Sequence, residues 1–156
     1  FSGLTVRRYG GIRPTRFVTD PPVEHALDAP FGDQVSLRGY TVLNNGDLLL
    51  FWQPPAGAAT SDLHMALQTS TLGGQPIARP ADRRLAGYTY PSFRWPAGKI
   101  VMGHVPAQEW LGEDAQPGTV QFSLRVYDGD DALATPLPTG AGESELLVTP
   151  VEVVVD

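Results

Sequence analysis

The 156-residue sequence contains no cysteine. This absence excludes disulfide bonds, thiolate zinc sites and cysteine nucleophiles. It does not prevent folding, because a chain of this length can bury enough apolar surface to hold a core without disulfides or a structural metal. The length therefore predicts one domain of modest size.

Positive charge is also scarce. The chain carries 11 Lys and Arg residues against 17 acidic residues, for a net charge of -6, and its only basic pairs are Arg7-Arg8 and Arg83-Arg84. A negative protein without a basic patch is repelled by phosphate backbones. We therefore expect no nucleic-acid partner.

Long apolar runs are missing as well. The longest one, Leu48 to Trp52, is far shorter than the about 20 residues that a transmembrane helix needs. We therefore expect no membrane insertion by this part of the sequence. Because the chain opens on Phe1 rather than Met, we expect any targeting or membrane segments to lie outside it.

Glycine and proline, by contrast, are abundant. The 17 Gly and 15 Pro residues make up about a fifth of the chain, below the roughly 25–30% typical of disordered proteins. The sequence therefore predicts a folded chain with many turns. Residues 1–21 show no sustained hydrophobic period and are interpreted as a linker or a loosely docked edge segment, followed by a folded domain over residues 22–156.

The hydrophobic pattern beyond this segment has a period of two. In its clearest stretch, residues 120–127, apolar and polar side chains alternate as in a strand with one buried face. Residues 48–53 are almost entirely apolar and predict a buried strand. The other predicted strands cover residues 23–27, 34–42, 63–68, 77–79, 99–105, 132–137 and 145–155, and one helical turn is predicted within 106–114.

Short strands at roughly ten-residue spacing, about eight in number, are typical of two stacked sheets. The predicted fold class is therefore all-β, a two-sheet antiparallel sandwich of immunoglobulin-like or jelly-roll type. In such a fold Trp52 belongs to the core. Trp110, in the predicted helical turn, is either core or an exposed anchor.

No pattern of catalytic or metal-binding residues stands out. The three histidines, His25, His64 and His104, occur singly, without the HxH or HExxH spacing that places two of them on one face. A GxSxG elbow and a phosphate-binding glycine loop are absent from the sequence. We therefore expect no enzymatic activity, no catalytic residues, no metal site and no cofactor.

The residues Asp128, Asp130 and Asp131 place three carboxylates close together. Calcium prefers clustered oxygen ligands, but the alternate spacing and the later Glu of an EF-hand loop are missing. A solvated hairpin turn is the favoured interpretation. Calcium binding is the open alternative.

One aromatic cluster remains as a candidate ligand site. Tyr88, Tyr90, Phe93 and Trp95 fall within residues 85–98, a stretch punctuated by glycine and proline for which no regular element is predicted. Exposed rings can stack on sugars or anchor a partner protein. Large aromatics in a proline-rich crossover also plug the open end of a sandwich core, and this second interpretation is favoured. The solvent exposure of Tyr90 and Trp95 distinguishes the two.

Several motifs occur in an order that resembles a known family. They are VSLRGYTV, GDLLLFWQP, DLHMALQT, LAGYTYPSFRWPAGKIV and PGTVQFSLRVYDGDD. Over about residues 23–137, the chain resembles the extracytoplasmic C-terminal β-sandwich domain of protein-mannosyltransferase-like membrane glycosyltransferases. The matching positions, such as Gly39, Asp47 and Trp52, mostly mark turns and core residues, and the resemblance implies no catalytic residues.

The resemblance implies an extracytoplasmic location, periplasmic or at the cell surface, with a membrane tether outside this sequence. It further implies a non-catalytic accessory module beside a sugar-handling membrane protein. The partner would then be a glycan or acceptor held by the aromatic cluster, or the parent membrane domain. The alternative hypothesis is a purely structural or protein-interaction sandwich domain without a small-molecule ligand.

Overall fold

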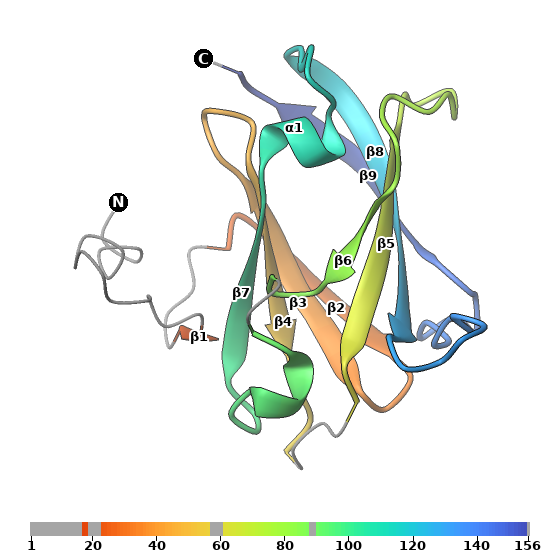
Figure 1. The fold of residues 1–156 in the computed structure, drawn as a ribbon. Helices are drawn as coiled ribbons and strands as arrows, with labels where there is room; N and C mark the ends of the chain where they lie inside the picture. The colour runs from red at the N-terminus through yellow and green to blue at the C-terminus, as the bar shows by residue number, and fades with distance from the viewer. Residues whose placement is uncertain (1–16, 19–22, 57–60, 88–89, 156) are drawn as a thin grey trace.

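Two antiparallel sheets stack face to face in the computed structural model (Figure 1). The structure describes residues 17–18, 23–56, 61–87 and 90–155. Sheet A has the strand order β1-β7-β4-β3-β2, and sheet B has the order β6-β5-β8-β9. The strands are β1 (Phe17–Val18), β2 (His25–Phe31), β3 (Val35–Val42), β4 (Leu48–Gln53), β5 (Leu63–Ser70), β6 (Ala81–Arg84), β7 (Ile100–Val105), β8 (Gly118–Asp128) and β9 (Leu146–Val153).

This architecture confirms the predicted all-β, two-sheet antiparallel sandwich. Apart from β1, a two-residue strand at the edge of sheet A, each sheet has four strands, in agreement with the predicted number. The predicted helical turn is α1 (Ala107–Trp110). Of the predicted linker, residues 1–21, only β1 belongs to the described residues.

Two strand predictions are wrong. Residues 132–137 form no strand and contribute only an isolated bridge, from Pro136 to Tyr127 of β8, because Pro136 has no N–H with which to extend a ladder. The sequence also predicts a strand at residues 77–79, whereas the strand β6 lies at Ala81–Arg84. Ile77 does donate its N–H to the Thr69 carbonyl at 2.9 Å, but Pro80 has no N–H and cannot continue the ladder. The pattern missed β6 because its residues are mostly polar, although Arg83 is buried.

Alternate side chains of both sheets fill the space between them. On β8, the four apolar residues predicted to face inward are all buried, and Trp52 on β4 is completely buried. Trp110 is also core: it is 1% exposed and packs edge-on against Phe122, with 6.1 Å between the ring centroids. Burial of each large apolar side chain contributes about 1.5–3 kcal/mol to stability.

Crossing segments close the two sides of the sandwich. On one side Leu85 passes so close to β7 that a Cβ on Gly103 would clash with the Leu85 carbonyl oxygen. Glycine is therefore required at this position of the strand. On the other side, residues 137–138 form hydrogen bonds with Val126 in β8 and with Gly32 after β2, each at 2.7 Å. These bonds join sheet B to sheet A.

The helical turn α1 covers one end of the core, where the β3–β4 turn holds it. Asp47 Oδ1 accepts the Ala107 N–H at 2.8 Å, and Asp47 Oδ2 lies 2.7 Å from His104 Nε2. Trp110 Nε1 donates to the Gly46 carbonyl at 2.9 Å. Burial raises the pKa of the Asp47 carboxyl, but the hydrogen bonds from His104 and Ala107 outweigh this effect, so the pKa lies below its ordinary value.

The Asp47 contacts predict a pH-dependent contribution to stability. A carboxyl whose pKa is lower in the folded state stabilises the fold above its unfolded pKa of about 4, and this contribution is lost as the pH falls through the folded pKa. Asp47→Asn should therefore lower the free energy of unfolding by about 1 kcal/mol at neutral pH and by less below about pH 4. Urea unfolding at a series of pH values measures the difference between the two proteins.

The matched control for this pH series is Asp114→Asn, which removes an exposed carboxylate in the loop after α1. It should leave the pH dependence unchanged. A difference between wild type and Asp47→Asn that stays constant from neutral to acid pH would contradict the assignment.

Candidate functional site

The candidate site lies in residues 85–98, which we call the aromatic segment, at the end of the sandwich where β4 ends and β5 begins (Figure 1). Its middle is the 3₁₀ turn η2 (Ser92–Arg94). The buried Ser92 donates its hydroxyl to the Ser61 carbonyl at 2.5 Å and accepts the Leu63 N–H at 2.8 Å. These bonds fix the turn on the start of β5.

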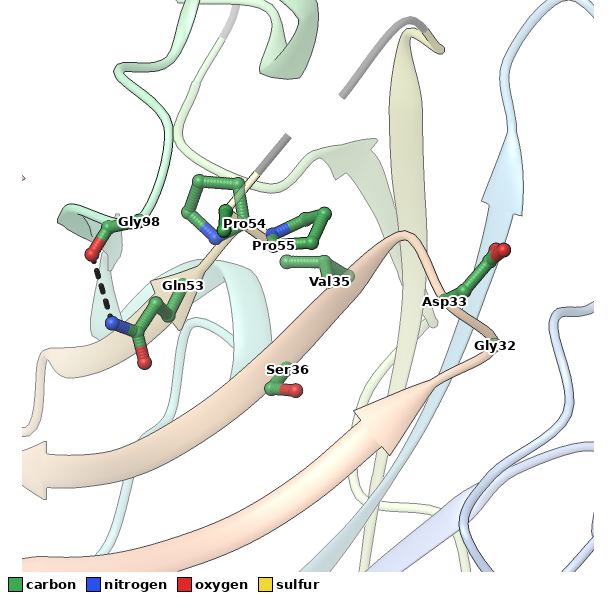
Figure 2. Close-up of a pocket in the computed structure, with 9 residues that line it drawn as sticks. Gly32, Asp33, Val35, Ser36, Gln53, Pro54, Pro55 and Gly98 are labelled. Atoms are coloured by element: carbon green, nitrogen blue, oxygen red, sulfur yellow. Dashed lines mark hydrogen bonds between the residues drawn. The ribbon is translucent and has the colours of Figure 1, made fainter. Parts of the chain in front are cut away.

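The last residue of the aromatic segment is fixed on β4. Gln53 Nε2 donates to the Gly98 carbonyl at 2.9 Å, as Figure 2 shows, and the Gly98 N–H donates to the Pro55 carbonyl at 3.2 Å. Gly98 has a φ angle of 70°, which glycine adopts without strain. The segment is thus held by β5 at its middle and by β4 at its end.

The described aromatic side chains of this segment differ in exposure. Trp95 is 3% exposed and belongs to the core, and its Nε1 donates to the Tyr90 carbonyl at 3.1 Å. The Tyr90 ring is half-buried against the core, 6.3 Å from the Trp95 ring, and burial raises the pKa of its hydroxyl. Phe93 is 46% exposed, with the Arg94 guanidinium 6.0 Å from its ring centroid.

The predicted site residues therefore do not form one exposed aromatic surface among the described residues. Trp95 faces inward, Tyr90 lies at the boundary, and Phe93 faces solvent; Tyr88 lies outside the described residues. Stacking on a sugar requires an accessible ring face, and Trp95 offers none. This geometry favours the plug interpretation for Trp95, while the Phe93 ring is exposed to solvent beside Arg94.

A solvent-open pocket of about 520 Å³, the rim pocket, adjoins Gly98 (Figure 2). Its volume falls within the roughly 300–1,000 Å³ of small-molecule sites. The Pro54-Pro55 pair contributes apolar surface, and Asp33, Ser36 and Gln53 contribute the polar side chains. The sequence gives no signal for this pocket, because the segments that line it meet only in the fold.

The histidines remain apart from one another. Within the described part of the chain, no group of three or more His, Asp or Glu side chains is arranged to hold a metal ion. Each ring instead has its own neighbour on a different part of the sandwich. These neighbours are Asp47 for His104 at 2.7 Å, Asp62 for His64 at 3.7 Å, and the Tyr40 ring for His25 at 4.7 Å between centroids.

The aspartate-rich loop after β8 forms hydrogen-bonded turns. Asp128 Oδ1 accepts the Asp130 N–H at 3.0 Å. The two oxygens of Asp131 accept the N–H groups of Leu133 and Thr135, each at 3.0 Å. These backbone hydrogen bonds lower the pKa of the Asp131 carboxyl. The carboxylates therefore order the loop itself, as the turn interpretation expects, and calcium binding stays the open alternative.

A polar cluster that the sequence did not indicate lies on the outer face of sheet B. The Tyr127 hydroxyl donates to the Asp82 carboxylate, and burial together with this bond raises the pKa of Tyr127 to about 12. Arg84 forms a two-pronged contact with Asp62, with its Nη2 2.9 Å from Oδ2, and the His64 ring lies 5.8 Å from the Tyr127 ring. A tyrosine that stays protonated is a poor nucleophile, so we interpret the cluster as structural.

Comparison of the chain with protein-family models, curated proteins and solved structures gives no match. Over the described ranges, no helix has the length and apolar character to cross a membrane. The resemblance to the mannosyltransferase-type C-terminal domain therefore remains a prediction. The location and the partner that it implies remain predictions as well.

Proposed function

We propose that this chain is a non-catalytic accessory domain on the extracytoplasmic side of a membrane, tethered beside a glycosyltransferase-like membrane part, and that it acts as a structural and protein-interaction module. The burial of Trp95 supports this choice over a sugar-stacking module. An indole in the core stabilises the domain but cannot receive a ligand. The membrane setting rests on the resemblance of the sequence motifs alone.

The arrangement of the polar groups also favours an interaction module over an enzyme. Acid–base catalysis needs groups that converge on one place where a substrate can sit. The contacts of His104 with Asp47 and of His64 with Asp62 lie on different sheets. Each pair therefore contributes to the fold at its own position, and the two pairs do not converge on a shared catalytic site.

Glycan binding at the rim is the second candidate function. Phe93 exposes part of its ring, and the rim pocket beside Gly98 combines apolar surface with the polar side chains of Ser36 and Gln53. Sugars bind to such combinations through their C–H faces and hydroxyl groups. This function does not require Trp95 to be accessible.

Titration of the 15N-labelled chain with methyl α-mannopyranoside and with a manno-oligosaccharide separates the two functions. If the chain is an interaction module, the signals of Gly98, Ser36 and the Gln53 side-chain amide should show no saturable chemical-shift changes during the titration. Phe93→Ala and the matched control Leu72→Ala, which removes an exposed side chain from the β5–β6 turn, should behave like the wild type. Saturable binding that Phe93→Ala abolishes and Leu72→Ala preserves would replace the proposed function by glycan binding.

The interaction itself can be tested by crosslinking, because the chain has no cysteine of its own. Single cysteines at three exposed positions, Phe93, Leu133 and Leu147, can each carry a photoreactive group within the protein that contains this domain. At least one should crosslink to the membrane part or to a specific neighbouring protein. If none of the three gives a specific product, a protein-interaction role is contradicted.

A further inference from the structure

The part of the chain that contains η2 carries a charge opposite to that of the rest. Residues 83–108 include four of the 11 Lys and Arg residues and no Asp or Glu, so the remainder of the chain has 17 acidic against seven basic residues. Within this range Arg94 and Lys99 are exposed. A negatively charged partner is therefore repelled by most of the protein and oriented toward these two side chains.

These two cations are not neutralised by carboxylates of the domain itself. Arg38, Arg83 and Arg84 each form an ion pair with a carboxylate. Over the described ranges, neither Arg94 nor Lys99 has a carboxylate within ion-pair distance. Both therefore keep their charge available for carboxylates of another molecule.

Two carboxylates lie at the same end of the sandwich, and both are placed away from these cations. Asp62, at the start of β5, is 13% exposed and is held by Arg84 at 2.9 Å. Asp33 lines the rim pocket on the side away from Gly98, as Figure 2 shows. Neither carboxylate reduces the positive charge of Arg94 or Lys99 by direct contact.

Phe93 places an apolar ring beside these charges. The side chain is 46% exposed, and the Arg94 guanidinium lies 6.0 Å from its ring centroid. Aromatic and arginine side chains are enriched at the centres of protein interfaces, whereas leucine is under-represented among the residues that contribute most binding energy. Phe93 is therefore a better anchor for a partner than the exposed Leu133 or Leu147.

The turns that present these side chains are fixed by the core. Ser92, at the start of η2, forms hydrogen bonds with the start of β5, and Trp95, just after η2, is buried. The Lys99 N–H donates to the Pro96 carbonyl at 3.2 Å, which closes the turn before β7. A surface that is ordered before it meets its partner loses less conformational entropy on binding.

We propose that Phe93, Arg94 and Lys99, which we call the basic surface, form the contact of this domain with an acidic face of a partner protein. The proposal rests on the function proposed above and adds the place of the interface and the charge of the partner. Carboxylates of the partner pair with Arg94 and Lys99, and an apolar side chain of the partner contacts the Phe93 ring. Anionic lipid is a poorer fit, because its recognition takes clusters of roughly four to eight cations.

Site-specific crosslinking in the protein that contains this domain tests the proposal. A photoreactive group on Ala97→Cys, an exposed position between Arg94 and Lys99, should give a specific product with a protein. Arg94→Glu combined with Lys99→Glu should lower the yield of this product about tenfold or more. The matched control, Arg79→Glu combined with Arg125→Glu, makes the same charge change at two exposed arginines outside the basic surface and should leave the yield nearly unchanged.

A second variant and a rescue test the two parts of the contact separately. Phe93→Ala should also lower the yield, because it removes the anchor and keeps both cations. Mass spectrometry should map the crosslink to a stretch of the partner that contains Asp or Glu. Replacing those acidic residues by Lys should restore the product of the Arg94→Glu and Lys99→Glu variant. Urea unfolding should show that each variant is as stable as the wild type.

The outcomes also separate this proposal from the proposed function. A specific product from Leu133→Cys or Leu147→Cys, with none from Ala97→Cys, would overturn the basic surface and leave the protein-interaction role intact. No specific product from any of these positions would contradict both. An unchanged yield in the charge-reversal variant would overturn the proposal as well. So would binding of the wild type, but not of that variant, to phosphatidylserine vesicles, which would identify a membrane surface instead.

Discussion

Replacing Trp95 by alanine should lower the free energy of unfolding by about 3–5 kcal/mol. The indole is 3% exposed, packs in the core, and donates its N–H to the Tyr90 carbonyl. Its removal leaves a cavity at the end of the sandwich and frees that carbonyl. Urea unfolding followed by circular dichroism measures the loss.

The matched control for Trp95 is Phe93, which lies two residues earlier in the same segment and is 46% exposed. Phe93→Ala should change the stability by no more than about 0.5 kcal/mol, as is typical of surface substitutions. Equal losses for the two variants, or a Trp95→Ala protein as stable as the wild type, would show that the segment does not plug the core.

Replacing Trp110 by alanine should also cost about 3–5 kcal/mol. This ring packs edge-on against Phe122, and its Nε1 bond to the Gly46 carbonyl joins α1 to the β3–β4 turn. The substitution therefore removes core volume and releases one side of α1. The same unfolding measurement applies.

Trp110→Phe separates the two contributions of this side chain. Phenylalanine keeps an apolar ring but cannot donate to the Gly46 carbonyl, so the loss should be clearly smaller than that for alanine. A hydrogen bond of this kind contributes about 0.5–1.5 kcal/mol. If Trp110→Phe is as unstable as Trp110→Ala, the ring packing is not the main contribution and this account of α1 is wrong.

Elements with a strong local pattern could be predicted from the sequence. β8 was predictable because its alternation of apolar and polar residues matches a sheet with one buried face. The almost entirely apolar sequence of β4 predicts a buried strand. The structure confirms this prediction, because the side chains on both faces of β4 are buried. β6 was not predictable, because its inward residue is Arg83, and the partner that makes its burial favourable, Glu109, lies in α1.

The candidate site depended more on contacts between distant residues. Phe93 and Trp95 are both aromatic and only two positions apart, yet one faces solvent and the other the core. The η2 turn sets this difference, and the turn is fixed by hydrogen bonds from Ser92 to the start of β5. The sequence of the segment does not show that Ser92 forms these hydrogen bonds, because their partners lie about 30 residues earlier in the chain. The rim pocket likewise could not be predicted, because its lining comes from separate segments.

The exchange rate of the Trp95 indole N–H shows whether Trp95 is part of the core and is closed to ligands. Hydrogen exchange followed by nuclear magnetic resonance, with the resonance assigned through Trp95→Phe, should show strong protection compared with a free indole. Exchange at the rate of an exposed tryptophan would contradict the plug and would restore the aromatic segment as a stacking surface.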